Sequence, residues 1–150
     1  MFGNIIHIGV TVSDLDRSIA FYRDTLGLTF QGEILMEGPE TEKIFAKKGV
    51  KARVAYLKAE GDLAAPPVEL IEFAGAGIEK RPMDLYRTGV SEICFACDDI
   101  WAEYRRLTAL GVKFISEPAA FDFTASGYGK SEACYFYDPD GVILELLQPQ

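Results

Sequence analysis

Two stretches of this chain carry the same order of apolar and polar positions. Residues 7–12 and 92–97 both have the apolar pattern of a β-strand. An aspartate stands at the same distance from the start of each stretch, Asp14 in the first and Asp99 in the second, and each precedes a helical pattern. An aspartate at such a place caps the free backbone N–H groups of a helix. The repeated order predicts a chain built from two similar halves.

A helix and further strands follow in each half. The helical positions are Leu15, Ile19, Tyr22 and Leu26 in the first half and Ile100, Tyr104, Leu107 and Leu110 in the second. A glycine, Gly27 or Gly111, ends each helical pattern, because it tolerates the left-handed conformation of a helix stop. Strand patterns then occupy residues 53–57 and 68–71, with a turn region at 61–67, and residues 133–137 and 144–147, with a tight turn at 138–141.

This order predicts an α+β fold of two βαβββ modules. We expect the first module at residues 1–74 and the second at residues 89–150. The linker between them is predicted at residues 75–88, where glycine and proline interrupt the pattern. A chain of 150 residues suits one compact domain made from two such modules.

The composition narrows the classes of function. Hydrophobic residues make up 49% of the chain, with 10 Phe and 7 Tyr, which is enough to bury a core. The net charge of -8 repels phosphate groups, so we expect neither nucleic acid nor a membrane as a partner. The sequence has no run of about 18 apolar residues and no pattern of a secretory signal. We therefore expect a cytoplasmic protein that acts on a small molecule.

The cysteines agree with a reducing compartment. The chain has 3 cysteines, an odd and low number that does not suit a disulfide scaffold. Cys94 and Cys97 have the spacing of a redox or zinc motif, but they stand in an apolar strand pattern. We favour packing in the core as their role.

Four side chains stand out because their surroundings are apolar. His7 is the only histidine, Glu92 takes its place in the second half, and Glu69 and Glu145 occupy matching places in the last strand of each half. A carboxylate in such a strand points to solvent, pairs with a cation or binds a metal, because an unpaired buried charge is costly. Exposure to solvent explains any one of the four. The matching positions of all four favour a metal site.

At these residues the sequence resembles the vicinal oxygen chelate superfamily. This superfamily includes glyoxalase I, methylmalonyl-CoA epimerase, extradiol dioxygenases and the fosfomycin and bleomycin resistance proteins. The similarity covers essentially the whole chain and is strongest at residues 7–8, 14–28, 89–93 and 138–145. The resemblance implies a glyoxalase-like fold, in which the modules form a curled mixed β-sheet cleft around a divalent metal. It also implies a homodimer.

The resemblance further implies that the metal ligands come from the first and last strands of each module. In this sequence those positions are His7, Glu69, Glu92 and Glu145. Family members usually carry a histidine at the place of Glu92, so this residue is either a ligand or a nearby base. Oxygen-rich ligation favours Mn²⁺, Mg²⁺, Fe²⁺, Co²⁺ or Ni²⁺, and Zn²⁺ is the remaining candidate.

Such a site predicts a metal-dependent lyase or isomerase of the glyoxalase type. The metal would stabilise an enolate oxygen, while Glu145, Glu69 or Glu92 removes the proton alpha to a carbonyl. One alternative is a non-catalytic protein that binds a small molecule such as an antibiotic. The other is an extradiol-type dioxygenase, which the single histidine disfavours.

Four further residues are candidates for contacts with the substrate. Arg53 and Tyr56 lie on a predicted central strand, where we expect them to face the cleft. Phe121 and Tyr128 lie in the loop before the last hairpin. For each of the four, packing or exposure in a loop is the alternative interpretation.

Overall fold

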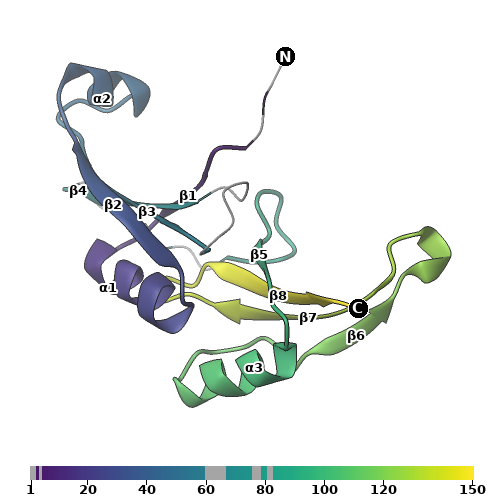
Figure 1. The fold of residues 1–150 in the computed structure, drawn as a ribbon. Helices are drawn as coiled ribbons and strands as arrows, with labels where there is room; N and C mark the ends of the chain where they lie inside the picture. Colours follow the sequence, from purple (N-terminus) through teal and green to yellow (C-terminus); the bar gives the residue numbers. More distant parts are fainter. Residues whose placement is uncertain (1–2, 4, 60–66, 76–78, 81–82) are drawn as a thin grey trace. The chain divides into compact units, whose positions relative to one another are not determined.

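The chain divides into two compact units, Met1–Lys80 and Arg81–Gln150. The computed structural model describes residues 3, 5–59, 67–75, 79–80 and 83–150 (Figure 1). The division falls inside the linker predicted at residues 75–88. Residues 76–78 and 81–82 of that linker lie outside the described residues, as does most of the turn region predicted at 61–67.

The first unit is a four-stranded mixed sheet with two short helices. Its elements are β1 (Ile8–Thr11), α1 (Leu15–Ala20), the π-helical turn η1 (Phe21–Thr25), β2 (Thr29–Met36), α2 (Pro39–Ile44), β3 (Lys51–Lys58) and β4 (Val68–Ala74). The strand order is β1-β4-β3-β2. The first strand runs parallel to β4, and the other pairs are antiparallel.

The second unit repeats this plan. Its elements are β5 (Ile93–Ala96), α3 (Ile100–Ala109), β6 (Ala119–Asp122), the 3₁₀ turn η2 (Thr124–Ser126), β7 (Lys130–Tyr137) and β8 (Ile143–Pro149). The strand order is β5-β8-β7-β6, again with one parallel pair, β5 with β8. The predicted α+β fold of two βαβββ modules is confirmed. The helix α2, which joins β2 to β3 in the first unit, is an addition that the sequence pattern did not predict.

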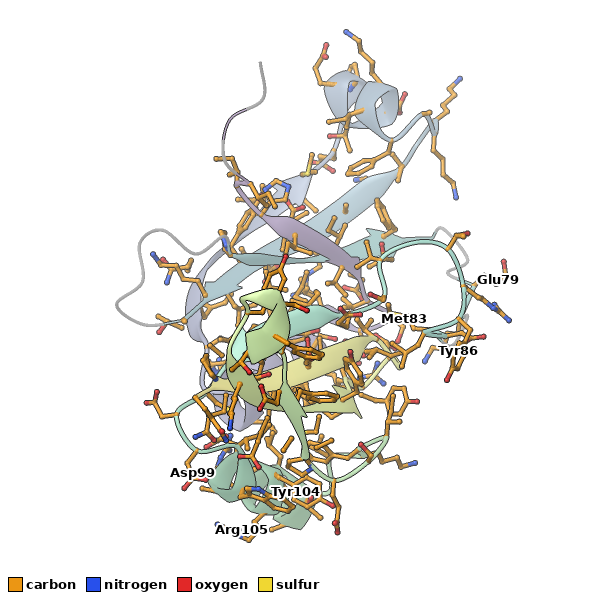
Figure 2. The ribbon with its side chains drawn as sticks, turned by 90° about the vertical axis from the view of Figure 1, so that its right-hand side faces the viewer. Glu79, Met83, Tyr86, Asp99, Tyr104 and Arg105 are labelled. Atoms are coloured by element: carbon orange, nitrogen blue, oxygen red, sulfur yellow. The ribbon has the colours of Figure 1, made fainter. Side chains whose placement is uncertain are left out.

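Both predicted helix starts have the expected cap. The Asp14 carboxylate accepts a hydrogen bond from the Arg17 N–H at 3.0 Å, and the Asp99 carboxylate accepts one from the Ala102 N–H at 2.8 Å. Figure 2 marks Asp99 where α3 begins. A cap of this kind satisfies backbone donors that have no partner inside the helix. None of the helices in the described part of the chain is long and apolar enough to cross a membrane.

The two faces of the first sheet differ in character. Val10 pairs with Leu70 in the register of β1 and β4, and both are buried on the face that α1 contacts. The neighbouring pair, Gly9 with Glu69, points to the opposite face, because successive side chains of a strand alternate. The face of the sheet away from α1 therefore carries Gly9 and Glu69.

Candidate functional site

Glu69 is the centre of the polar group in the first unit. Its side chain comes from β4, a strand with β1 on one side and β3 on the other, and the residue is only 9% exposed. The Tyr56 hydroxyl donates a hydrogen bond to Glu69 Oε1 at 2.6 Å. On the other side, His7 Nε2 lies 3.2 Å from Glu69 Oε2. Each carboxylate oxygen therefore has its own polar neighbour.

The register of the sheet explains why these three side chains meet. Tyr56 on β3 stands directly opposite Glu69. Gly9 on β1 stands opposite it on the other side, and His7 lies two positions earlier, on the same face as Gly9. A Cβ atom at Gly9 would lie 3.4 Å from Glu69 Oε2. The glycine therefore leaves open the space beside the carboxylate and the imidazole.

The carboxylate also affects the ionisation of its tyrosine partner. The hydrogen bond to Glu69, together with burial and the negative charge of the carboxylate, raises the pKa of Tyr56 to about 12. The phenol thus keeps its proton at neutral pH and remains a hydrogen-bond donor.

The second unit places a related group around Glu145. Cys94 on β5 and Tyr135 on β7 stand opposite Glu145 in the register, and all three point to one face. Burial, followed by a hydrogen bond to Glu145, raises the pKa of the Cys94 thiol to about 12. Burial and the charges of Glu145 and Glu92 also raise the pKa of Tyr135. Glu92 therefore belongs to the same electrostatic neighbourhood.

The two groups are equivalent in sequence order but differ in their contacts. By register, Tyr56 corresponds to Tyr135 and Glu69 to Glu145. Gly9 corresponds to Cys94, so the position that is open in the first unit carries a thiol in the second. In the described part of the chain, the hydroxyl of Tyr135 makes no hydrogen bond of the kind that joins Tyr56 to Glu69.

The predicted substrate contacts on β3 lie on opposite faces of their sheet. Tyr56 faces Glu69, whereas Arg53 faces α1. The guanidinium of Arg53 forms ion pairs with three carboxylates: those of Asp16, Glu33 and Glu72. Residues three positions apart on a strand point to opposite sides, so the two side chains cannot line one surface. Substrate binding by Arg53 stays a prediction.

The two aromatic candidates of the second unit lie in an exposed region. Phe121 on β6 is 41% exposed and stacks on Phe123, with 5.7 Å between the ring centroids. Tyr128 lies in the turn before β7 and is 86% exposed. Both side chains are accessible, and their contact with a substrate stays a prediction.

Comparison with known proteins identifies the family. The model of the Glyoxalase/Bleomycin resistance protein/Dioxygenase superfamily matches residues 4–146. The chain belongs to this superfamily. Among curated proteins it is 31% identical to the uncharacterized protein YaeR of Escherichia coli, over 95% of this chain and 93% of that protein. It is 29% identical to a lactoylglutathione lyase of Haemophilus influenzae, over 96% of this chain and 91% of that enzyme.

Solved structures agree with the fold of the superfamily. A glyoxalase family protein from Bacillus cereus superposes with a TM-score of 0.84 at 18% identity, covering 99% of this chain and 95% of that one. The trypanothione-dependent glyoxalase I of Leishmania major has a TM-score of 0.69 at 22% identity, covering 98% and 87%. These likenesses concern the fold, because sequence identity this low does not carry a reaction.

The donors in the first unit fit the metal that superfamily membership implies. An imidazole nitrogen and a carboxylate oxygen 3.2 Å apart have nearly the spacing of neighbouring ligands on one ion. Bonds of about 2.1 Å at a right angle would place two such atoms about 3.0 Å apart. Within the described residues of either unit, no three His, Cys, Asp or Glu side chains gather as a metal-binding group.

Two residues on the face of Glu145, Cys94 and Tyr135, were not predicted from the sequence as its neighbours. Cys94 is exposed at the surface of its sheet, with its thiol only partly buried beside Glu145, so the role in core packing that we expected for it is wrong. The alternation of side chains along the strand could have predicted this position, because it places Cys94 on the same face as Glu92. Tyr135 was also missed. Its relation to Glu145 depends on the register of β7 with β8, which the sequence pattern alone does not fix.

Proposed function

We propose that this protein is a divalent-metal-dependent lyase or isomerase of the glyoxalase type. The observation that carries the proposal is the group around Glu69, in which a nearly buried carboxylate lies beside the single histidine of the chain. A carboxylate this poorly solvated needs compensating partners, and a divalent cation beside the imidazole would supply the missing positive charge. The lactoylglutathione lyase named among the relatives supports the same reaction class.

The proposed ligands are His7, Glu69, Glu92 and Glu145. Their oxygen and nitrogen donors suit Mn²⁺, Mg²⁺, Fe²⁺, Co²⁺, Ni²⁺ or Zn²⁺. A bound divalent ion would supply a Lewis acid that stabilises negative charge on the substrate oxygen during proton transfer. We also propose that the residues of both units bind one ion, and that the substrate is a small molecule.

Glu145 is the residue that we propose as the base. Glu69 is held by the Tyr56 hydroxyl and lies beside His7, whereas the partner of Glu145 is a thiol, which is a weak hydrogen-bond donor. A weakly held carboxylate can reach a carbon-bound proton, remove it, exchange it with water and deliver a proton to the neighbouring carbon. In this scheme Glu69 serves only as a ligand of the metal ion, and Glu92 is the second candidate for the base.

The hemithioacetal of methylglyoxal and glutathione is the first substrate to test. We expect the metal-loaded protein to convert it to the lactoyl thioester, with loss of activity after chelation and recovery after addition of Mn²⁺ or Ni²⁺. In deuterated water the product should carry solvent deuterium on the carbon that receives the proton. Replacement Glu145→Gln should lower kcat by about 10²- to 10⁴-fold. Glu117→Gln, which changes an exposed carboxylate outside the strands, is the matched control.

Two results would contradict the proposal. One is metal-loaded protein that exchanges no alpha-hydrogen in this substrate or in a panel of 2-oxo and acyl-thioester compounds. The other is protein that elemental analysis finds free of metal even after incubation with each candidate ion. A protein that binds small aromatic compounds without metal would instead be a binding protein, and consumption of oxygen with Fe²⁺ would indicate a dioxygenase.

A further inference from the structure

We infer that Tyr56 is a positioning residue that fixes the Glu69 carboxylate for metal binding. The inference rests on the proposed function and adds a residue to it. Tyr56 itself is not a proposed ligand. It acts through Glu69 by holding one carboxylate oxygen, so that the other is presented beside His7.

The contacts of Glu69 assign a separate task to each of its oxygens. Oε1 accepts the Tyr56 hydroxyl at 2.6 Å, a short bond of the kind that a charged acceptor makes. Oε2 is the oxygen that lies 3.2 Å from His7 Nε2, on the side left open by Gly9. With Oε1 occupied, the carboxylate would bind an ion through Oε2 alone, next to the imidazole nitrogen.

The strand that carries Tyr56 is well placed to hold it still. It is an inner strand of the sheet, paired with β2 on one side and β4 on the other. The residues on either side of Tyr56, Ala55 and Leu57, are fully buried. Ligands held by a rigid hydrogen-bond partner bind metal more tightly, because less motion is lost on binding.

The second unit provides an internal comparison. Tyr135 has the same register position relative to Glu145, but the hydrogen bond given to Glu145 comes from the Cys94 thiol. The same residue type at the same place in the repeat therefore makes different contacts. The positioning role is inferred only for the tyrosine that is bonded to its carboxylate.

The first experiment measures Mn²⁺ binding without any substrate. Mn²⁺ titrations followed by electron paramagnetic resonance would compare the wild-type protein with Tyr56→Phe, Tyr135→Phe, Glu69→Gln and Tyr86→Phe. We expect Tyr56→Phe to weaken binding by about 10- to 100-fold, and Tyr135→Phe by clearly less. Tyr86, marked in Figure 2 on the segment before β5, is 98% exposed, so its variant should bind as the wild type does.

The second experiment uses the single histidine as a reporter. His7 gives the only imidazole signals in a nitrogen-15 NMR spectrum of the whole chain, so no assignment is needed. Addition of Zn²⁺ should move these signals in the wild-type protein, and Tyr56→Phe should need correspondingly more Zn²⁺ for the same change. Circular dichroism of each variant would show that the fold is retained.

The possible outcomes separate the inference from the proposed function. Absence of metal binding by the wild-type protein would overturn both. Loss of binding in Glu69→Gln, with Tyr56→Phe unchanged, would overturn the positioning role and leave the proposed function in place. Equal losses in Tyr56→Phe and Tyr135→Phe would also overturn it, because the effect would then not come from the bond to Glu69.

Discussion

The same residue in the same register acquires different chemical surroundings in the two units. Glu69 and Glu145 each stand opposite a tyrosine on the adjacent strand. Only the first is bonded to that tyrosine, while the second accepts a hydrogen bond from a thiol. The units also differ at the position opposite each carboxylate on the first strand, which is Gly9 in one and Cys94 in the other.

The Cys94 thiol should react slowly with alkylating reagents in the folded protein. Its pKa of about 12 leaves almost no thiolate at pH 8, and the thiolate is the reactive form. We expect labelling by iodoacetamide, followed by mass spectrometry of the Cys94 peptide, to be much slower than in the unfolded chain. The rate should keep rising with pH through the range in which an ordinary thiol, with a pKa near 8.5, is already ionised.

The variant Glu145→Gln tests the cause of this shift. It should speed the labelling of Cys94 only in part, because burial is the larger cause and Glu145 the smaller one. Glu117→Gln serves as the control, and a chelator keeps the protein free of metal. Labelling of wild-type Cys94 at the rate of the unfolded chain would show that the thiol is not held as described.

At the scale of elements, one arginine ties a helix to the sheet in the first unit. Arg53 on β3 bonds Asp16 on α1 at 2.8 Å and Glu33 on β2 at 2.7 Å, and it reaches Glu72 on β4 at 3.3 Å. In the second unit, Glu132 on β7 occupies the position that corresponds to Arg53 on β3, and it also contacts the helix of its unit. There the Trp101 indole N–H on α3 donates to Glu132 on β7 at 3.2 Å. In each unit, a side chain from the first turn of the helix, Asp16 or Trp101, therefore contacts the third residue of an inner strand.

Loss of the arginine should destabilise the first unit. Arg53→Gln leaves three carboxylates close together without their shared cation, so we expect the melting temperature to fall by a few degrees at low salt. High salt should reduce the difference by screening the repulsion. Arg53 lowers the pKa of Asp16 from its ordinary 3.8. The stabilisation of the folded protein by this ion pair is therefore present above that pH and is lost as the pH falls below it.

A peripheral ion pair provides the control for this change. Lys43 lies 3.8 Å from Glu40, and both side chains are more than 80% exposed, so Lys43→Gln should have almost no effect. Thermal melts followed by circular dichroism, at two salt concentrations and across the acid range, measure both variants. An Arg53→Gln protein as stable as the wild type at low salt would show that the ion pairs add nothing.

The sequence predicted the regular elements better than their irregularities. Strand alternation, aspartate caps and glycine stops fixed the positions of α1 and α3, because each of these signals is local. The π-helical turn at Phe21–Thr25 was not predicted, although it keeps Tyr22 fully buried. The helix α2 was missed as well, since Gly38 and Pro39 at its start were not weighed as helix signals. Such features depend on how a segment packs, which periodicity does not report.

At the scale of the whole molecule, the repeat made most of the fold predictable but only part of the site. The matching positions predicted His7, Glu69, Glu92 and Glu145 as metal ligands, and this set stays a prediction. The cross-strand partners Tyr56 and Cys94 could be linked to their carboxylates only through the register, which is set by pairing between distant segments. A repeat in sequence therefore indicates which residues correspond, while the contacts of each residue come from its own sheet.

The four proposed ligands belong to two units, which leads to a prediction about stability. An ion held by residues of both units should protect both against thermal unfolding, and an ion held by one unit should protect that unit alone. At a Mn²⁺ concentration about 100 times the Kd, binding stabilises by about 2.7 kcal/mol, which is a rise of roughly 5 to 10 °C in the melting temperature. Glu69→Gln and Glu145→Gln should each abolish most of that rise, and Glu117→Gln should keep it. If the rise disappeared in Glu69→Gln but persisted in Glu145→Gln, the first unit alone would hold the ion, and the four-ligand site would be wrong.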